Sequence, residues 1–365
     1  MASGTMIRDL TRGNVVKQLF SFALPLFVSN ALQAVYNLVD MVIVGHCIGP
    51  AGMSAVSIGG DLLHLLTFVA MGFSSAGQVI IARAVGADRR EEIPRTIGTM
   101  FTFLLSVALV IALACFALRR SVLAWLNTPA DSLSFALDYL VTCVCGLVFI
   151  YGYNIVSAIL RGMGDSRRPF IFIAVAAVLN TVLDVLFVKY LGMAVFGAAL
   201  ATVIGQGVSF VASVVYLYFR RESFGFDFKP ASFKVDPSAF KKLLALGVPM
   251  AIQSAAVSFS KIILMAWINL FDVTYSALAG VYNKINIMSG VISQAFTTAG
   301  STMVGQNLGA RQYGRVNRTL LTVLSSGLLM AFAATAVMLL WPRGVYELFT
   351  PDAGLLAVAS VLTVP

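Results

Sequence analysis

Charged residues are scarce in this sequence. Of its 365 residues, 11% are charged and 59% are hydrophobic, whereas a typical soluble domain has about 25% charged residues. The deficit excludes an ordinary soluble domain and indicates a polytopic protein embedded in a lipid bilayer. The formal net charge is +9, but the basic residues lie in short loops between apolar runs. That distribution is typical of membrane topology rather than of nucleic-acid binding.

Residues for metal binding and enzyme catalysis are also few. The four cysteines lie in or beside apolar segments, and Cys143 and Cys145 point to different faces of a helix. This spacing predicts neither a zinc site nor a disulfide. The sequence contains no Walker lysine loop, nucleotide-binding domain or Ser/His/Asp hydrolase arrangement. We therefore expect neither an enzyme nor a cofactor, and any pump would have to use an ion gradient.

Long apolar runs dominate the rest of the chain. Nine of them can cross about 30 Å of hydrocarbon, and a tenth begins near residue 353. When the N-terminus is placed inside, most of the basic residues fall in inner loops, which predicts a cytoplasmic N-terminus. The runs are 18–44, 52–82, 97–118, 133–160, 170–190, 194–219, 243–270, 274–303 and 319–341.

The second half of the chain repeats the first at a nearly constant offset in the numbering. Leu24-Pro25 recurs as Val248-Pro249 at an offset of 224, and Gly86-Ala87 recurs as Gly309-Ala310 at an offset of 223. Two further matches, Ser54–Val56 and Ser74–Gly77 with their counterparts, have offsets of 222 and 223. The repeat predicts two lobes in the same orientation, related by an axis along the membrane normal.

The lobe boundaries follow from this repeat. We expect a first lobe of six helices at residues 1–219, a cytoplasmic linker at 220–242 and a second lobe at 243–365. A complete second lobe would also have six helices, whereas residues 243–365 provide about three and a half. We therefore expect the chain to be a fragment that lacks about two and a half helices.

Two carboxylates lie at matching depth in separate spans. Asp40 comes five residues before Gly45, near the outer end of the first span, and Asp184 comes five residues before Lys189 at the end of the fifth. At 1.5 Å per residue, each lies about 7–8 Å below the outer boundary. Asn180 lies one turn before Asp184 on the same helix face.

An ionisable group within hydrocarbon is costly and is therefore a candidate for function. Two carboxylates at one level of a helix bundle can share a proton, hold a monovalent cation or bind a cationic ligand. The alternative is that Asp40 and Asp184 are structural, each bonded to a neighbouring helix.

Four other ionisable residues lie inside spans. Asp61 and His64 lie three positions apart on one face of the second span, so they could form a second proton relay or a hydrogen-bonded pair that fixes helix packing. Lys261 and Lys284 interrupt the seventh and eighth spans. Each could be a snorkelling or salt-bridged lysine, or a gating cation between the two halves.

Taken together, these features resemble the multidrug and toxic compound extrusion (MATE) family. They are Leu24-Pro25 and Asp40 in the first span, the loop at 161–169 with the sequence Arg-Gly-Met-Gly-Asp-Ser-Arg-Arg-Pro, the Asn180-x-x-x-Asp184 pattern and the two lobes. The resemblance implies an all-α membrane fold of the MATE/MOP type. It also implies that Asp40 and Asp184 bind a coupling proton or sodium ion.

Further site residues follow from the same resemblance. Asn180, Thr202 and the backbone carbonyl of Ala198 are expected to complete a sodium site with the two aspartates. Polar positions that resemble the lining of a substrate cavity are Gln33, Tyr36 and Asn154.

The resemblance also implies an activity. The seventh span carries Lys261 and no acid, which favours the DinF-like branch, whose coupling residues lie in the first lobe. We expect a monomeric secondary antiporter of the bacterial inner membrane. It would export organic cations or amphipathic drugs in exchange for H⁺ or Na⁺.

Two other functions are alternatives. A flippase for a lipid-linked pyrophosphate saccharide would need arginines in its cavity, and no arginine lies within the spans. A non-transporting membrane receptor or scaffold would not need two carboxylates at matching depth.

Overall fold

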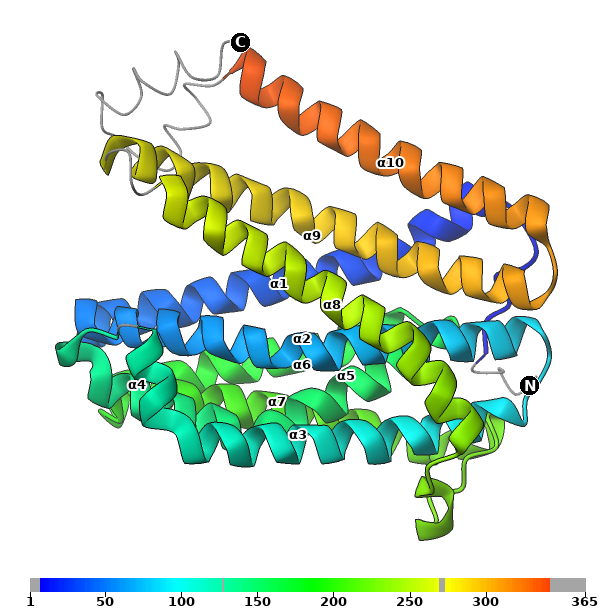
Figure 1. The fold of residues 1–365 in the computed structure, drawn as a ribbon, viewed down its shortest axis with the longest axis horizontal. Helices are drawn as coiled ribbons and strands as arrows, with labels where there is room; N and C mark the ends of the chain where they lie inside the picture. Colours follow the sequence, from blue (N-terminus) through cyan, green and yellow to red (C-terminus); the bar gives the residue numbers. More distant parts are fainter. Residues whose placement is uncertain (1–6, 127, 269–272, 342–365) are drawn as a thin grey trace.

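The computed structural model of the chain describes residues 7–126, 128–268 and 273–341, and within these segments the fold is all-helical. The described residues form ten α-helices, which lie roughly along one long direction (Figure 1). Their bounds are α1 Val15–Ile48, α2 Pro50–Gly86, α3 Glu92–Trp125, α4 Ala130–Cys145, α5 Leu147–Gly162, α6 Arg167–Asp184, α7 Ala194–Phe219, α8 Pro237–Ile268, α9 Val273–Gly309 and α10 Tyr313–Leu340.

The nine complete runs correspond to these helices, whereas the tenth run, which begins near residue 353, lies outside the described residues. Among the described residues, seven helices are long and apolar enough to cross a membrane, namely α1, α2, α3, α6 with its continuation, α7, α8 and α10. The run at 133–160 differs from a straight span, because α4 and α5 meet at Gly146 with a bend of 46°. A side chain at Gly146 would collide with Val203 of α7, so this glycine allows α7 to pack closely at the bend.

Two helix boundaries also differ from the expected ones. The first helix continues past Gly45 to Ile48, and the chain then turns at Gly49, which has a φ of 89° and is followed by Pro50 at the start of α2. Glycine accepts this left-handed conformation and proline suits the first turn of a helix. α8 begins at Pro237 rather than after 242, because Asp236 Oδ1 accepts a hydrogen bond from the Ala239 amide at 2.8 Å.

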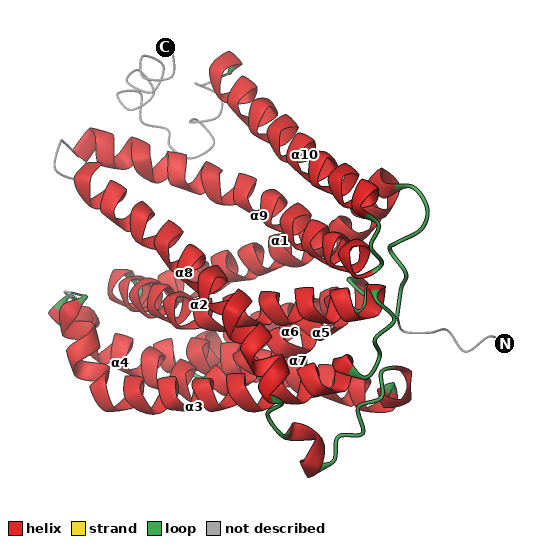
Figure 2. Ribbon diagram, turned by 45° about the vertical axis from the view of Figure 1, so that its right-hand side comes forward, coloured by secondary structure: helices red, strands yellow, loops and turns green. Residues whose placement is uncertain are grey.

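The helices form two groups. We use the name first lobe for α1 to α7, which pack around a core that includes Ile81, Ile97 and Tyr151. We use the name second lobe for α8 to α10, of which α8 and α9 pack against α2 and α9 also packs against α1. In both views α8 and α9 lie close to α2 towards one end and diverge from the first lobe towards the other (Figures 1 and 2).

The end where the lobes meet carries most of the loops. We call it the basic end; it comprises residues 7–14, the α2–α3 turn at 87–91, the segment 220–236 and the α9–α10 turn at 310–312. Segment 220–236 packs on α3, where Thr102 Oγ1 donates a hydrogen bond to the Phe233 carbonyl and Thr99 Oγ1 accepts one from the Asp236 amide.

Small residues bring α7 close to α6. Gly197, Ala201, Gly205 and Ser209 recur every four residues in α7, and all four are buried. Small residues at this spacing allow membrane helices to approach closely. The effect is greatest at Gly205, which lies against the Ala176 carbonyl and Asn180 of α6.

Candidate functional site

The two aspartates lie in the interior of the first lobe. Asp40 of α1 is 6% exposed and Asp184, the last residue of α6, is 0% exposed. α1 packs against both α6 and α7, and the two carboxylates are close enough for their charges to interact. The structure therefore brings together two acids that lie far apart in the sequence.

Neither carboxylate is fully satisfied by the protein. Asp40 Oδ1 and Asp184 Oδ1 are buried and have no hydrogen-bond partner among the described residues. A buried polar atom without a partner costs free energy. Each of these oxygens therefore has a free lone pair for a proton or a cation.

Asn180 and Thr202 extend the site on α6 and α7. In the amide orientation that satisfies its neighbours, Asn180 Nδ2 donates to Asp184 Oδ2 at 3.3 Å, and its oxygen accepts from the Thr202 amide at 3.2 Å. The same amide oxygen lies 3.3 Å from Thr202 Oγ1. One turn earlier in α7, Ala198 is fully buried in the neighbouring apolar core.

The helix changes its pitch directly after Asp184. α6 continues as a π-helix, η1, at Val185–Tyr190. Short π-helical insertions are rare and occur frequently at functional sites. The wider turn lies on the segment that also packs against α1.

Tyr36 joins the aspartate site from α1, one turn before Asp40. Its hydroxyl lies within electrostatic reach of both carboxylates and beside the Gln206 side chain of α7. Gln206 is a residue that the sequence analysis missed. Its position one turn after Thr202, on the same helix face, was the available signal.

The two other predicted cavity residues are less closely involved. Gln33 lies on α1, partly exposed and almost a full turn before Tyr36. Asn154 of α5 is partly buried and donates its side-chain amide to the Ile150 carbonyl of its own helix at 2.8 Å. No described hydrogen bond connects Asn154 to the aspartates.

Asp61 and His64 differ from Asp40 and Asp184 in their exposure. Both side chains are exposed on α2, and the described contacts include no hydrogen bond or ion pair between them. The His64 ring packs on Phe68 with centroids 4.8 Å apart. Further along α2, Ala82 meets α9, where Gly305 approaches it.

The two predicted intramembrane lysines belong to the second lobe. Lys261 is part of α8 and Lys284 of α9, but their side chains lie outside the described residues. A cavity of about 830 Å³ lies at the basic end and is lined by residues such as Asp9, Arg90 and Gln306. It is separate from the aspartate site.

The apolar helices and the buried polar site within them define a multi-pass membrane transporter. The MatE family model matches residues 25–186 and again residues 249–363. The chain therefore belongs to the MATE family, whose members are multidrug efflux transporters rather than enzymes.

Bacterial relatives and solved structures agree with this assignment. The chain is 30% identical to the probable multidrug resistance protein YpnP of Bacillus subtilis over 84% of its length and 68% of that protein. It is 31% identical to YoeA of the same organism, over 85% and 68% of the two chains. A MOP superfamily transporter from Pyrococcus furiosus has the same fold, with a TM-score of 0.89 at 22% identity over 100% of this chain and 80% of the other.

Proposed function

We propose that this protein is a secondary antiporter that exports organic cations or other amphipathic compounds across the bacterial inner membrane in exchange for H⁺ or Na⁺. The observation that carries the proposal is the pair of buried carboxylates, Asp40 and Asp184, each with an oxygen that lacks a partner among the described residues. The names of the relatives, probable multidrug resistance proteins, support the class of substrate.

Ion binding and substrate release are linked by competition. Two carboxylates in one interior cannot be neutralised at the same time by a small cation and by a cationic substrate. Binding of the ion at Asp40 and Asp184 therefore favours release of the substrate, and the lobes alternate between states open to either side.

The neutral oxygens provide the choice of ion. Na⁺ prefers several oxygen ligands, and the amide of Asn180, the hydroxyl of Thr202 and the carbonyl of Ala198 are suitable. A proton needs only one of the carboxylates, and Asn180 would then be its hydrogen-bond partner.

The topology is part of the same proposal. We place the N-terminus and the basic end in the cytoplasm, in accordance with the positive-inside rule. We further propose lobes at 1–219 and 243–365, linked by 220–242, and a monomeric protein. The two family matches begin at Pro25 and Pro249, which supports the repeat.

The proposal is tested with the full-length protein in proteoliposomes. An imposed Na⁺ or H⁺ gradient should drive efflux of a fluorescent organic cation, and Asp40→Asn and Asp184→Asn should each reduce this efflux to background. Asp138→Asn, a change to an exposed residue of α4, should have no effect. Unchanged gradient-driven efflux in both site variants would refute the assignment, and the pH change that the cation evokes with and without Na⁺ identifies the coupling ion.

A further inference from the structure

At the basic end, α2 and α9 approach each other backbone to backbone. A side chain on Gly86 would collide with the Gln306 carbonyl, and one on Gly309 would collide with the Arg83 carbonyl. Gln78 of α2 also crosses this contact and donates to Thr302 Oγ1 of α9 at 2.7 Å. The two lobes are therefore closed against each other at this end.

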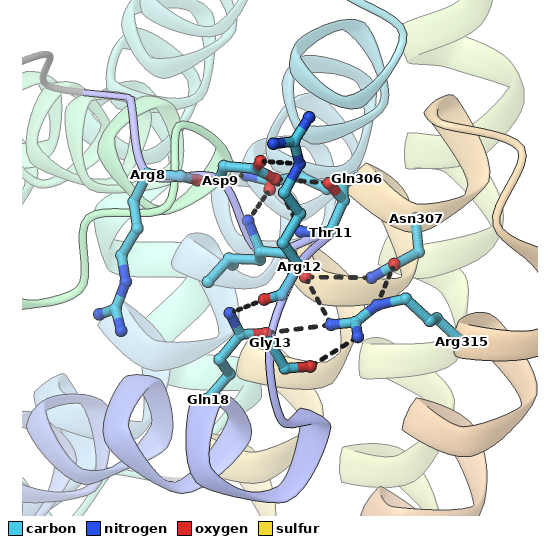
Figure 3. Close-up of polar contacts among 10 residues, drawn as sticks. Arg8, Asp9, Thr11, Arg12, Gly13, Gln18, Gln306, Asn307 and Arg315 are labelled. Carbon is cyan, nitrogen blue, oxygen red and sulfur yellow. Dashed lines mark hydrogen bonds and ion pairs between the residues drawn. The ribbon is translucent and has the colours of Figure 1, made fainter.

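Arg315 of α10 ties the second lobe to the chain segment before α1 (Figure 3). Its guanidinium donates to the Gly13 carbonyl at 2.6 Å, to the Leu10 carbonyl at 3.3 Å and to Gln18 Oε1 of α1 at 3.2 Å. Asn307 Oδ1 holds its Nε at 3.0 Å. The planar guanidinium thus uses its donors to join three parts of the chain.

The segment held by Arg315 is also anchored to the first lobe. The Arg8 amide donates to the Met163 carbonyl at 2.9 Å, which fixes the segment to the loop after α5. On the side of the second lobe, Gln306 Oε1 of α9 accepts from the Leu10 amide at 2.8 Å. Burial raises the pKa of Asp9, but hydrogen bonds from Thr11 and the nearby charges of Arg12 and Arg315 outweigh it and lower that pKa overall. Asp9 therefore stays ionised beside Arg315.

A second contact crosses the lobes on the other side of the basic end. Lys242 Nζ of α8 lies 2.7 Å from Glu92 Oε2 of α3, with the side chains 47% and 27% exposed. Lys242 lies in the first turns of α8, at the end of the proposed linker, and Glu92 lies at the start of α3, so the ion pair joins α8 to the first lobe.

The two contacts occupy equivalent positions in the internal repeat. Glu92 corresponds to Arg315 at an offset of 223, and Gln18 corresponds to Lys242 at an offset of 224. These are the same offsets that relate Gly86 to Gly309 and Pro25 to Pro249. Each contact joins the first helix of one lobe to the third helix of the other, so the pair Gln18–Arg315 mirrors the pair Lys242–Glu92.

We infer that these two cross-lobe contacts are latches that hold the basic end closed and must break before it opens. The inference rests on the proposed function in one respect: antiport is the reason why the lobes have to move relative to each other. The Arg315 latch has several charge-assisted hydrogen bonds and is the stronger one. The Glu92–Lys242 latch is a half-exposed ion pair, which adds only a modest stabilisation of the closed basic end.

The ion-pair latch is tested by measuring the distance between the lobes. Spin labels at Glu91→Cys and Asn317→Cys, both exposed positions at the basic end, are introduced into the full-length protein after its native cysteines have been replaced by alanine. Pulsed electron resonance in lipid nanodiscs then gives the ratio of short to long distances. Glu92→Lys and Lys242→Glu should each lower this ratio about two- to fivefold, and the double exchange should restore it.

A neighbouring lysine provides the matched control. Lys241 is exposed and makes no ion pair with a described residue, so Lys241→Glu, with the same change of charge, should leave the ratio unchanged. If both single reversals leave the distances unchanged, or if the double exchange fails to restore them, the ion-pair latch is refuted.

The Arg315 latch is tested in both directions. Arg315→Ala should lower the ratio about tenfold, whereas Arg318→Ala, which removes an exposed arginine in the same turn, should not. Gln18→Glu should raise the ratio, because it converts a neutral acceptor into a carboxylate facing Arg315. Misfolding alone cannot make Arg315→Ala lower the ratio and Gln18→Glu raise it. If both variants have the same ratio as the unmodified protein, the inference is overturned. Because no gradient or substrate is present, the result is independent of the Asp40 and Asp184 transport assay.

Discussion

Buried polar groups have different environments at the basic end and in the interior of the first lobe. At the basic end, Gln306 is 0% exposed, and its amide both accepts from the Leu10 amide and donates to the Arg8 carbonyl. In the interior, Asp40 and Asp184 are buried to a similar extent, yet each keeps an oxygen with no described partner.

If the proposed function holds, the difference separates polar groups that stabilise the fold from polar groups that bind the transported ion. A polar group whose partners belong to the protein stabilises the arrangement in which they meet. A buried carboxylate with an oxygen that lacks a partner has the opposite effect. On the proposed function, the missing partner is the coupling ion, which binds and leaves. The comparison can be sharpened by removing polar groups from both regions.

The largest effect is expected at the basic end. Gln306→Leu should lower the free energy of unfolding by about 3 kcal/mol, because the Leu10 amide and the Arg8 carbonyl both lose a buried partner. Asp184→Asn should lower the free energy of unfolding by less than about 1 kcal/mol or should raise it, because the substitution replaces an incompletely paired buried carboxylate with a neutral amide. Thermal unfolding in detergent, followed by circular dichroism, measures both; a loss of equal size in the two variants would contradict the comparison.

The glycine contact should give the next largest effect. Gly86→Ala forces α2 away from the Gln306 carbonyl and should cost about 2 kcal/mol through overpacking. Gly60→Ala is the matched control, since a methyl group at Gly60, in the same helix, meets no atom within 4 Å. If the two variants melt at the same temperature, the backbones of α2 and α9 are not in tight contact.

Much of the fold could be predicted because it depends on local composition. The apolar runs within the described residues coincide with helix, and Asp40 and Asp184 were correctly placed on separate helices. The bend at Gly146 was missed because it depends on how α7 packs there. The π-helix after Asp184 was missed for a similar reason, since an apolar sequence does not distinguish it from an α-helix.

The site residues that escaped prediction are those defined by packing between distant segments. Gln206 was overlooked because its relation to Tyr36 exists only once α7 lies against α1. The repeat indicated that Gln18 and Lys242, or Glu92 and Arg315, are equivalent positions. It did not indicate that Gln18 would contact Arg315, or that Lys242 would contact Glu92. Those contacts exist only once the two lobes have assembled.

Removal of a neutral oxygen ligand should have a smaller effect on transport than removal of a carboxylate. If Na⁺ is the coupling ion, Thr202→Val keeps the shape of the side chain but removes its hydroxyl, and should weaken Na⁺ activation of efflux about fivefold, equivalent to about 1 kcal/mol. Thr142→Val is the control, because that hydroxyl donates only to the Asp138 carbonyl of its own helix. Equal Na⁺ dependence in the two variants would remove Thr202 from the ion site.

The smallest effect is expected in the segment between the lobes, where a polar cluster is exposed to solvent. Hydrogen bonds from the Ser232 hydroxyl and from Lys229 lower the pKa of Asp227 to about 2, from an ordinary value of 3.8. Because the folded pKa is the lower one, the stabilisation is fully present above about pH 4 and is lost as the pH falls towards 2. Hydrogen exchange of residues 226–233 should therefore become faster over that interval in the unmodified protein. Asp227→Asn should exchange at a rate that is independent of pH there, once the intrinsic pH dependence of exchange is removed; an unchanged pH response in this variant would mean that another carboxylate orders the segment.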